Sequence, residues 1–220
     1  MNSSAATSHP AHRSAQRHQR DSVAVEAVSL LGVRVTAYAL INENEHQRRN
    51  VAQVGAVTNP ALLDRLMDLP IGIAVVDPVI WAETADQPAG IVERDRDGLG
   101  VRRLLAPPLV LEDVVINAAA GRELSAVRDA SLFSGFTRRW MAATTSQIPE
   151  VAILEAKACG VGVLDIHRGV QLPAENPASL TIDGWSWLLL EKIYRRWLKK
   201  RPEVRVRANP TEATGEARAT

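Results

Sequence analysis

The stretch PEVAILEAKACGVGVLDIHRGVQLP, residues 149–173, decides the fold class of this chain. Pro149 suits the first turn of a helix, Glu150 favours the positive helix N-terminus, and Gly160 is typical of a helix end. The following run of small and β-branched residues ends at Asp165, and a second short run starts after an Arg-Gly turn. The stretch therefore predicts a helix followed by two strands, and with them an α/β protein.

Outward from this stretch, hydrophobic periodicity predicts further helices and strands. We expect helices at 23–31, 42–57, 61–69 and 122–143, the last broken in two at Gly135, and strands at 33–41, 71–77, 101–106 and 109–121. The apolar run at 71–77 (IGIAVVD) is typical of a buried strand. Residues 83–100 are rich in acids and turn formers and are expected to be an exposed loop or hairpin. The predicted fold class is α/β, with a mixed sheet flanked by helices.

Two segments about 90 residues apart share one pattern of proline, amphipathic helix, turn and β-branched run ending in aspartate. They are residues 60–77 (PALLDRLMDLPIGIAVVD) and 149–165 (PEVAILEAKACGVGVLD). A duplicated strand–helix–helix–strand–strand unit, covering 33–107 and 113–173, would explain the pattern. Apolar αβ units also share a generic pattern by chance, so both explanations stay open.

A strand, a polar helix and an amphipathic helix leading into GVGVLDIHRGVQLP resemble the carboxy-terminal half of the PD-(D/E)xK, or restriction-endonuclease-like, superfamily. In that superfamily the strand before the polar helix ends in an acid, any residue and a lysine. Here the strand ends as Ile116-Asn117-Ala118-Ala119-Ala120, and in the first half as Ala39-Leu40-Ile41-Asn42. The resemblance therefore implies a degenerate nuclease-like fold without the metal site, and it assigns no catalytic residue.

One literal acid-x-Lys triplet lies elsewhere, at Glu155-Ala156-Lys157. On a strand both charged side chains would face one side, where the carboxylate could bind a metal ion and the ammonium could stabilise negative charge. On a helix they would diverge by about 200°. The flanking Pro149 and Gly160 favour the helix. We interpret Cys159 as a buried thiol and His167 as an exposed turn residue, and we expect no catalytic residue, metal site or cofactor.

The 220 residues are 46% hydrophobic and 23% charged, which is typical of a globular protein. Cys159 is the only cysteine, so an intrachain disulfide is excluded and the cytoplasm is the expected location. No apolar run approaches the roughly 20 residues that a bilayer core requires, so no membrane span is expected.

We expect a disordered basic tail at 1–21, a single α/β domain at 22–201 and a disordered tail at 202–220. The sequence leaves the oligomeric state open.

The most distinctive segment is TIDGWSWLLLEKIYRRWLKKRP, residues 181–202. It predicts an amphipathic helix at 183–200 with a stripe formed by Trp187, Leu190, Tyr194 and Trp197. Between Lys192 and Arg207 there are eight bases and one acid. The candidate nucleic-acid-binding residues are Arg195, Arg196, Lys199, Lys200 and Arg201. The apolar stripe has three possible destinations, which are the body of the same chain, a protein partner or a membrane surface.

Three functions follow from these features. The favoured one is a non-enzymatic, cytoplasmic, DNA-binding protein with a degenerate nuclease-like fold that contacts nucleic acid through the basic helix. The first alternative is an active metal-dependent nuclease that uses Glu155 and Lys157 on a strand. The second is an interaction or assembly protein whose carboxy-terminal helix docks a protein partner.

Overall fold

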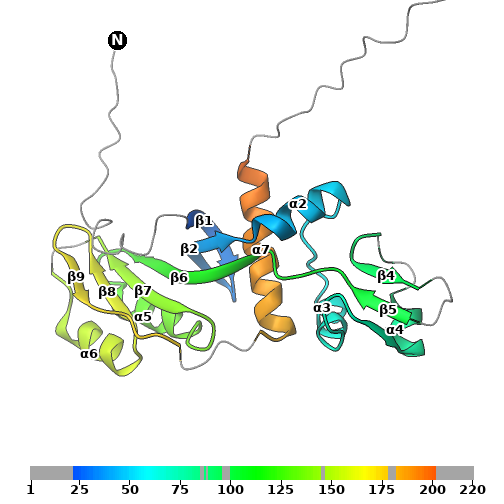
Figure 1. Ribbon diagram of the computed structural model, residues 1–220. Helices are drawn as coiled ribbons and strands as arrows, with labels where there is room; N and C mark the ends of the chain where they lie inside the picture. The colour runs from blue at the N-terminus through cyan, green and yellow to red at the C-terminus, as the bar shows by residue number, and fades with distance from the viewer. Residues whose placement is uncertain are drawn as a thin grey trace, which may run out of the picture.

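The computed structural model describes residues 22–84, 87, 89–95, 100–144, 147–177 and 182–201 (Figure 1). Within these ranges the chain forms a six-stranded mixed sheet and a three-stranded sheet, both accompanied by helices. The predicted α/β fold with a mixed sheet and flanking helices is therefore confirmed. The tails predicted at 1–21 and 202–220 lie outside the described residues. No described helix is both long and apolar enough to cross a membrane.

The large sheet has the order β1-β2-β6-β7-β8-β9. Its strands are β1 (Val23–Leu30), β2 (Val33–Ile41), β6 (Leu109–Ala118), β7 (Arg138–Ala143), β8 (Gly162–Asp165) and β9 (Gly169–Leu172). The pairs β1-β2, β2-β6 and β8-β9 are antiparallel, whereas β6-β7 and β7-β8 are parallel. The parallel pairs require crossover connections, and α5 (Glu123–Ser131) and α6 (Glu150–Ala158) provide them.

A second layer is built from the chain between β2 and β6, which we call the excursion, residues 43–107. It contains α2 (Glu43–Val51), α3 (Pro60–Met67), β3 (Ala74–Val76), α4 (Pro78–Glu83), β4 (Val92–Arg94) and β5 (Gly100–Arg103). Its three strands form the small sheet in the order β3-β5-β4. The excursion begins and ends at one place, because the backbone N–H of Asn42 donates to the carbonyl of Pro108 at 2.9 Å.

Helix α7 (Gly184–Lys200) joins the two layers and stands between the two sheets (Figure 1). Its residues Trp187 and Leu188 belong to the core of the excursion. Leu189, Ile193 and Tyr194 belong instead to the core of the large sheet, together with apolar residues of α5 and α6. The helix predicted for 183–200 is confirmed. Three residues of its apolar stripe, Trp187, Leu190 and Tyr194, are buried inside the chain, and Trp197 is half-buried.

Two segments predicted as helix are strands. Residues 23–31 contain β1, in which a β-bulge lies between Val25 and Val28 and Ala27 has a φ of 57°. The bulge shifts the alternation by one residue, so the buried positions 25 and 28 are three apart and imitate a helical spacing. Residues 138–143 form β7, which lies between β6 and β8. Its Met-Ala-Ala end favours helix locally, but pairing on both sides overrides that preference.

The apolar run at 71–77, predicted to be a buried strand, contains the short strand β3 (Ala74–Val76), and it is not buried. β3 is the edge of the small sheet, and Ile73 and Val76 are exposed.

The two halves that share a sequence pattern differ in their elements. Residues 113–173 place β7 between α5 and α6, whereas no described strand separates α2 from α3. The predicted strand–helix–helix–strand–strand unit is therefore not repeated in the fold.

Replacing Gly162 with alanine is expected to destabilise the protein by about 1–3 kcal/mol. A Cβ at this position would overlap the Trp140 ring and would lie 2.8 Å from the backbone nitrogen of Ala174. The matched control is Gly135→Ala, whose Cβ meets nothing within 4 Å. Urea denaturation of both variants measures the difference. Equal stability of Gly162→Ala and wild type would contradict the close packing described here.

Candidate nucleic-acid interface

The position of α7 is fixed at its N-terminus by a capping box. The Asp183 carboxylate accepts the Ser186 N–H at 2.7 Å, and the Ser186 hydroxyl oxygen accepts the Asp183 N–H at 2.7 Å. The hydrogen bond from Ser186 N–H keeps the pKa of Asp183 below its ordinary value. Since this end is held and the middle of the helix is buried, the charged C-terminal end has a defined place on the surface.

We call the five candidate residues Arg195, Arg196, Lys199, Lys200 and Arg201 the basic end. All are exposed except Arg196, which is half-buried. Among the residues that the structure describes, Glu26 on β1 is the one acid that pairs with this surface, through Lys200 at 3.2 Å. Arg196 Nε also donates to the Glu26 backbone carbonyl at 3.4 Å. The structure therefore brings the five predicted residues together, with an excess of positive charge.

Arg201 has two uncharged neighbours. Its guanidinium carbon lies 4.4 Å from the centre of the Trp197 ring, a cation–π distance. Its Nη1 lies 2.9 Å from His46 Nε2 on α2. Neither contact neutralises the charge, so Arg201 is oriented by the body of the protein and stays available as a cation.

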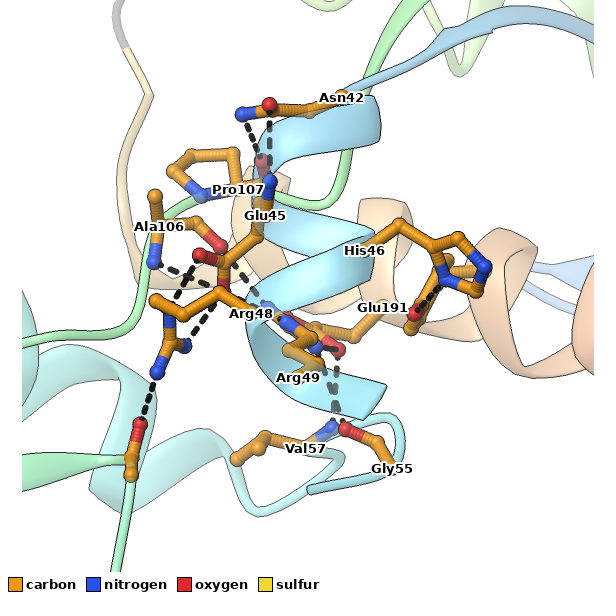
Figure 2. Close-up of polar contacts among 12 residues, drawn as sticks. Asn42, Glu45, His46, Arg48, Arg49, Gly55, Val57, Ala106, Pro107 and Glu191 are labelled. Atoms are coloured by element: carbon orange, nitrogen blue, oxygen red, sulfur yellow. Dashed lines mark hydrogen bonds and ion pairs between the residues drawn. The ribbon is translucent and has the colours of Figure 1, made fainter. Parts of the chain in front are cut away.

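A buried ionic cluster that sequence reasoning missed lies between α2 and α7 (Figure 2). Arg49 on α2 donates to both oxygens of Glu191 on α7, at 2.7 and 2.9 Å. Its Nε donates to Glu45 Oε1 at 2.7 Å. Glu191 also accepts the backbone N–H of Val57 at 2.8 Å and the indole N–H of Trp187 at 3.0 Å. The cluster joins α2, α7 and the connection between α2 and α3 through buried charges.

Hydrogen bonds within the cluster stabilise the charged forms of Glu45 and Arg49. Burial alone would raise the pKa of Glu45, but hydrogen bonds from Arg48 and Arg49 hold it below its ordinary value. Burial would likewise lower the pKa of Arg49, yet the bonds to Glu191 and Glu45 raise it. Both groups stay ionised across the neutral range, so their charged hydrogen bonds hold α7 against α2. The one sequence feature that could have indicated this cluster is the spacing of four residues between Glu45 and Arg49 on a helix, which allows an ion pair.

His46 lies between this cluster and the basic end. Its Nε2 faces the Arg201 guanidinium at 2.9 Å, and a guanidinium can only donate. Nε2 is therefore the acceptor, and Nδ1 carries the proton that it donates to the Tyr194 hydroxyl at 2.8 Å. Burial, and then the positive charge of Arg201, lower the pKa of His46; Glu43 raises it and Arg49 lowers it further. Neutral His46 is the form that fits this site.

The stability of the protein is expected to fall as the pH drops below 6.5, the ordinary pKa of histidine. His46 has a lower pKa in the folded state, so between the two pKa values the unfolded chain binds more protons. Its contribution is complete above pH 6.5 and is lost as the pH falls toward the folded-state value. Urea unfolding between pH 5 and pH 8 measures it. His46→Gln should flatten this part of the profile, whereas the control His167→Gln, in an exposed turn, should not.

The other candidate residues are not brought together. Glu155 and Lys157 lie on α6, so the helix interpretation is confirmed, and Glu155 faces Arg128 of α5 at 4.0 Å. Cys159 was predicted to be buried and is half-buried at the end of α6. His167 is exposed in the β8–β9 turn, as predicted. No group of three or more His, Cys, Asp or Glu side chains suited to a metal ion occurs within the described ranges.

Comparisons with known proteins add no function: no protein-family model, no curated protein and no solved structure matches this chain. The resemblance to PD-(D/E)xK proteins therefore stays a prediction from the sequence. The function has to be argued from the geometry of the basic end.

Proposed function

We propose that this protein binds nucleic acid through the basic end of α7, without catalysing a reaction on it. The observation that carries the proposal is the imbalance of charge on a fixed helix end. Five cations gather there, and one described acid, Glu26, pairs with them. An exposed ion pair such as Lys200–Glu26 contributes about 0–1 kcal/mol, so it competes weakly with a phosphate. The cytoplasmic location and the kinship with nuclease-like proteins belong to the same proposal and rest on the sequence.

The size of the surface sets the expected number of phosphate contacts. A helix rises 1.5 Å per residue, so residues 195–201 extend over about 9 Å. Phosphates along one DNA strand are spaced about 3.4 Å apart along the duplex axis, so about three of them can face the basic end. Phosphate contacts carry no sequence information, and we expect binding that depends on salt and not on base sequence.

The two alternative functions have less support. The nuclease alternative requires Glu155 and Lys157 on one face of a strand, and they lie on a helix. The assembly alternative requires an accessible aromatic stripe on α7. Trp187 and Tyr194 are instead buried within the chain and Trp197 is half-buried, while the exposed aromatic of this helix is Trp185, outside the stripe.

The proposal is tested by fluorescence anisotropy with a labelled DNA duplex over a range of salt concentrations. For about three contacts, log K should fall with log salt with a slope of about −2.7. The triple variant Arg195→Gln, Lys199→Gln, Lys200→Gln removes three exposed charges and spares Arg196 and Arg201, which contact the body. It should lower the affinity at least about tenfold and flatten the slope.

The matched control is Arg122→Gln, Arg128→Gln, Arg168→Gln, which removes three exposed charges from α5 and its surroundings and from the β8–β9 turn. Both triple variants have the same net charge, so only the position of the charges differs. Glu26→Gln should strengthen binding, because it frees Lys200. Equal losses in both triple variants would contradict a localised site. No salt-sensitive binding by the wild type near 0.15 M salt would reject the proposed function itself.

A further inference from the structure

A cleft of about 550 Å³ lies where the end of the large sheet meets the first turns of α7. Its walls come from the end of β2, the connection between α3 and β3, the end of the excursion, the start of β6, the turn after α5, and α7 with the residues just before it. The lining residues include the polar Asn42 and Ser186 and the apolar or small Ile71, Val110, Gly135 and Ile182. Among the residues that the structure describes, none of those lining this cleft is charged.

The polar groups on the wall are already engaged within the protein. Asn42 Nδ2 donates to the Pro107 carbonyl at 3.3 Å, and its Oδ1 accepts the Glu45 N–H at 3.2 Å. Ser186 belongs to the capping box of α7. Three large apolar side chains on the wall remain open to solvent, with exposures of 52% for Ile71, 57% for Val110 and 42% for Ile182. An occupant would therefore gain by covering apolar surface and would find no countercharge.

These properties decide between classes of occupant. A nucleotide or a lipid headgroup needs cations, and the described part of the wall has none. A stable protein interface takes about 800 Å² and 20–30 residues from each partner, which is more than the 15 described residues that line this cleft. Sites for small molecules have volumes of about 300–1,000 Å³ and mostly apolar walls. We propose that the cleft binds an uncharged, predominantly apolar small molecule, at a site separate from the basic end.

Gly135 offers a way to fill the cleft without disturbing its walls. A Cβ at Gly135 meets nothing within 4 Å, and its φ is not in the left-handed region. A leucine side chain there would begin in open space on the cleft wall. Gly55 has the same two properties and does not line the cleft, so Gly55→Leu is a matched control.

A second pair of variants tests whether binding depends on the uncharged wall of the cleft. Val110 lines the cleft and is 57% exposed, and Val151 on α6 is equally exposed and lies elsewhere. Val110→Lys places a cation on the wall, whereas Val151→Lys adds the same charge at a distance. Both side chains start from exposed positions, so neither substitution buries a charge.

The experiment is a titration of the full chain with Nile red, an uncharged dye whose emission shifts to the blue in apolar surroundings. We expect saturable binding by the wild type and displacement of the dye by 1-dodecanol. Gly135→Leu or Val110→Lys should raise the Kd at least about tenfold, which corresponds to 1.4 kcal/mol, while both control variants stay within about twofold. Circular dichroism establishes that each variant is folded.

Three results would overturn this inference. The first is the lack of saturable dye binding by the wild type. The second is saturable binding that neither cleft variant weakens, because the dye would then bind elsewhere. The third is a wild-type dimer that Val110→Lys dissociates, because the cleft would then be a protein interface. None of these results depends on nucleic-acid binding, so the two proposals fail separately.

Discussion

Replacing Arg49 with methionine is expected to lower the free energy of unfolding by about 3–5 kcal/mol. Arg49 is fully buried, and it is the cation that faces the buried Glu191 carboxylate. Its removal leaves Glu191 in a low-dielectric site with hydrogen bonds from Val57 and Trp187 but no countercharge. Small domains have a total stability of about 5–15 kcal/mol, so this loss is a large share of it. Urea denaturation measures the change.

The control for this prediction is the neighbouring residue. Arg48 also pairs with Glu45, but its side chain is 29% exposed, so Arg48→Met should cost less than about 1 kcal/mol. Adding Glu191→Gln to Arg49→Met should restore part of the lost stability, because the orphaned charge disappears. If the double variant is less stable than Arg49→Met alone, the loss does not come from the unpaired carboxylate.

Replacing Trp187 with alanine is expected to cost about 3–5 kcal/mol as well, by a different mechanism. The ring is fully buried in the core of the excursion, where the Arg103 guanidinium lies 5.3 Å from its centre. Alanine would leave a cavity between α3 and α7 and remove the indole N–H from Glu191. The buried arginine would lose its aromatic neighbour and keep its hydrogen bond to the Leu66 carbonyl at 2.7 Å.

Trp185 is the matched control because it lies on the same helix two residues earlier and is 66% exposed. Trp185→Ala should change the stability by no more than about 0.5 kcal/mol. Both variants lose a tryptophan from α7, so the difference between their free energies of unfolding measures the effect of burial. Similar stabilities for both variants would mean that α7 does not join the two cores as described.

The elements that sequence reasoning predicted correctly have local signals of their own. α7 combines the Asp183 cap with a periodic apolar stripe, and α6 lies between Pro149 and Gly160. The errors arose where distant contacts decide the outcome. A bulge in β1 changed the spacing of its buried residues, and β7 is a strand because it lies between two others. The exposure of β3 follows from its place at a sheet edge, which no local pattern encodes.

The two candidate sites, the basic end and the cleft, also differ in whether the sequence could predict them. The basic end could be predicted because its five residues lie within seven positions of one helix. The cleft could not, because its wall unites residues from positions 40 to 190 that only the folded chain brings together. The ionic cluster is intermediate, since Glu45 and Arg49 are neighbours on a helix and Glu191 follows 142 residues after Arg49.

The excursion also determines when, during synthesis on the ribosome, the parts of this protein can assemble. The ends of the excursion meet at Asn42 and Pro107, 65 residues apart. Closing a loop of this length costs about 3 kcal/mol more than closing a two-residue hairpin, so pairing of β2 with β6 is entropically disfavoured until later elements support it. That support includes α7, which is made after every other described helix and strand.

Arg49 leaves the ribosome 142 residues before its partner Glu191. At about 5–20 residues per second, the wait lasts about 7 to 28 seconds. During that time the nascent excursion lacks Trp187 and Leu188, so Leu63 and Leu66 on α3 lack the α7 side chains that belong to the same core. A newly made chain therefore presents an incomplete core to chaperones and proteases until α7 emerges.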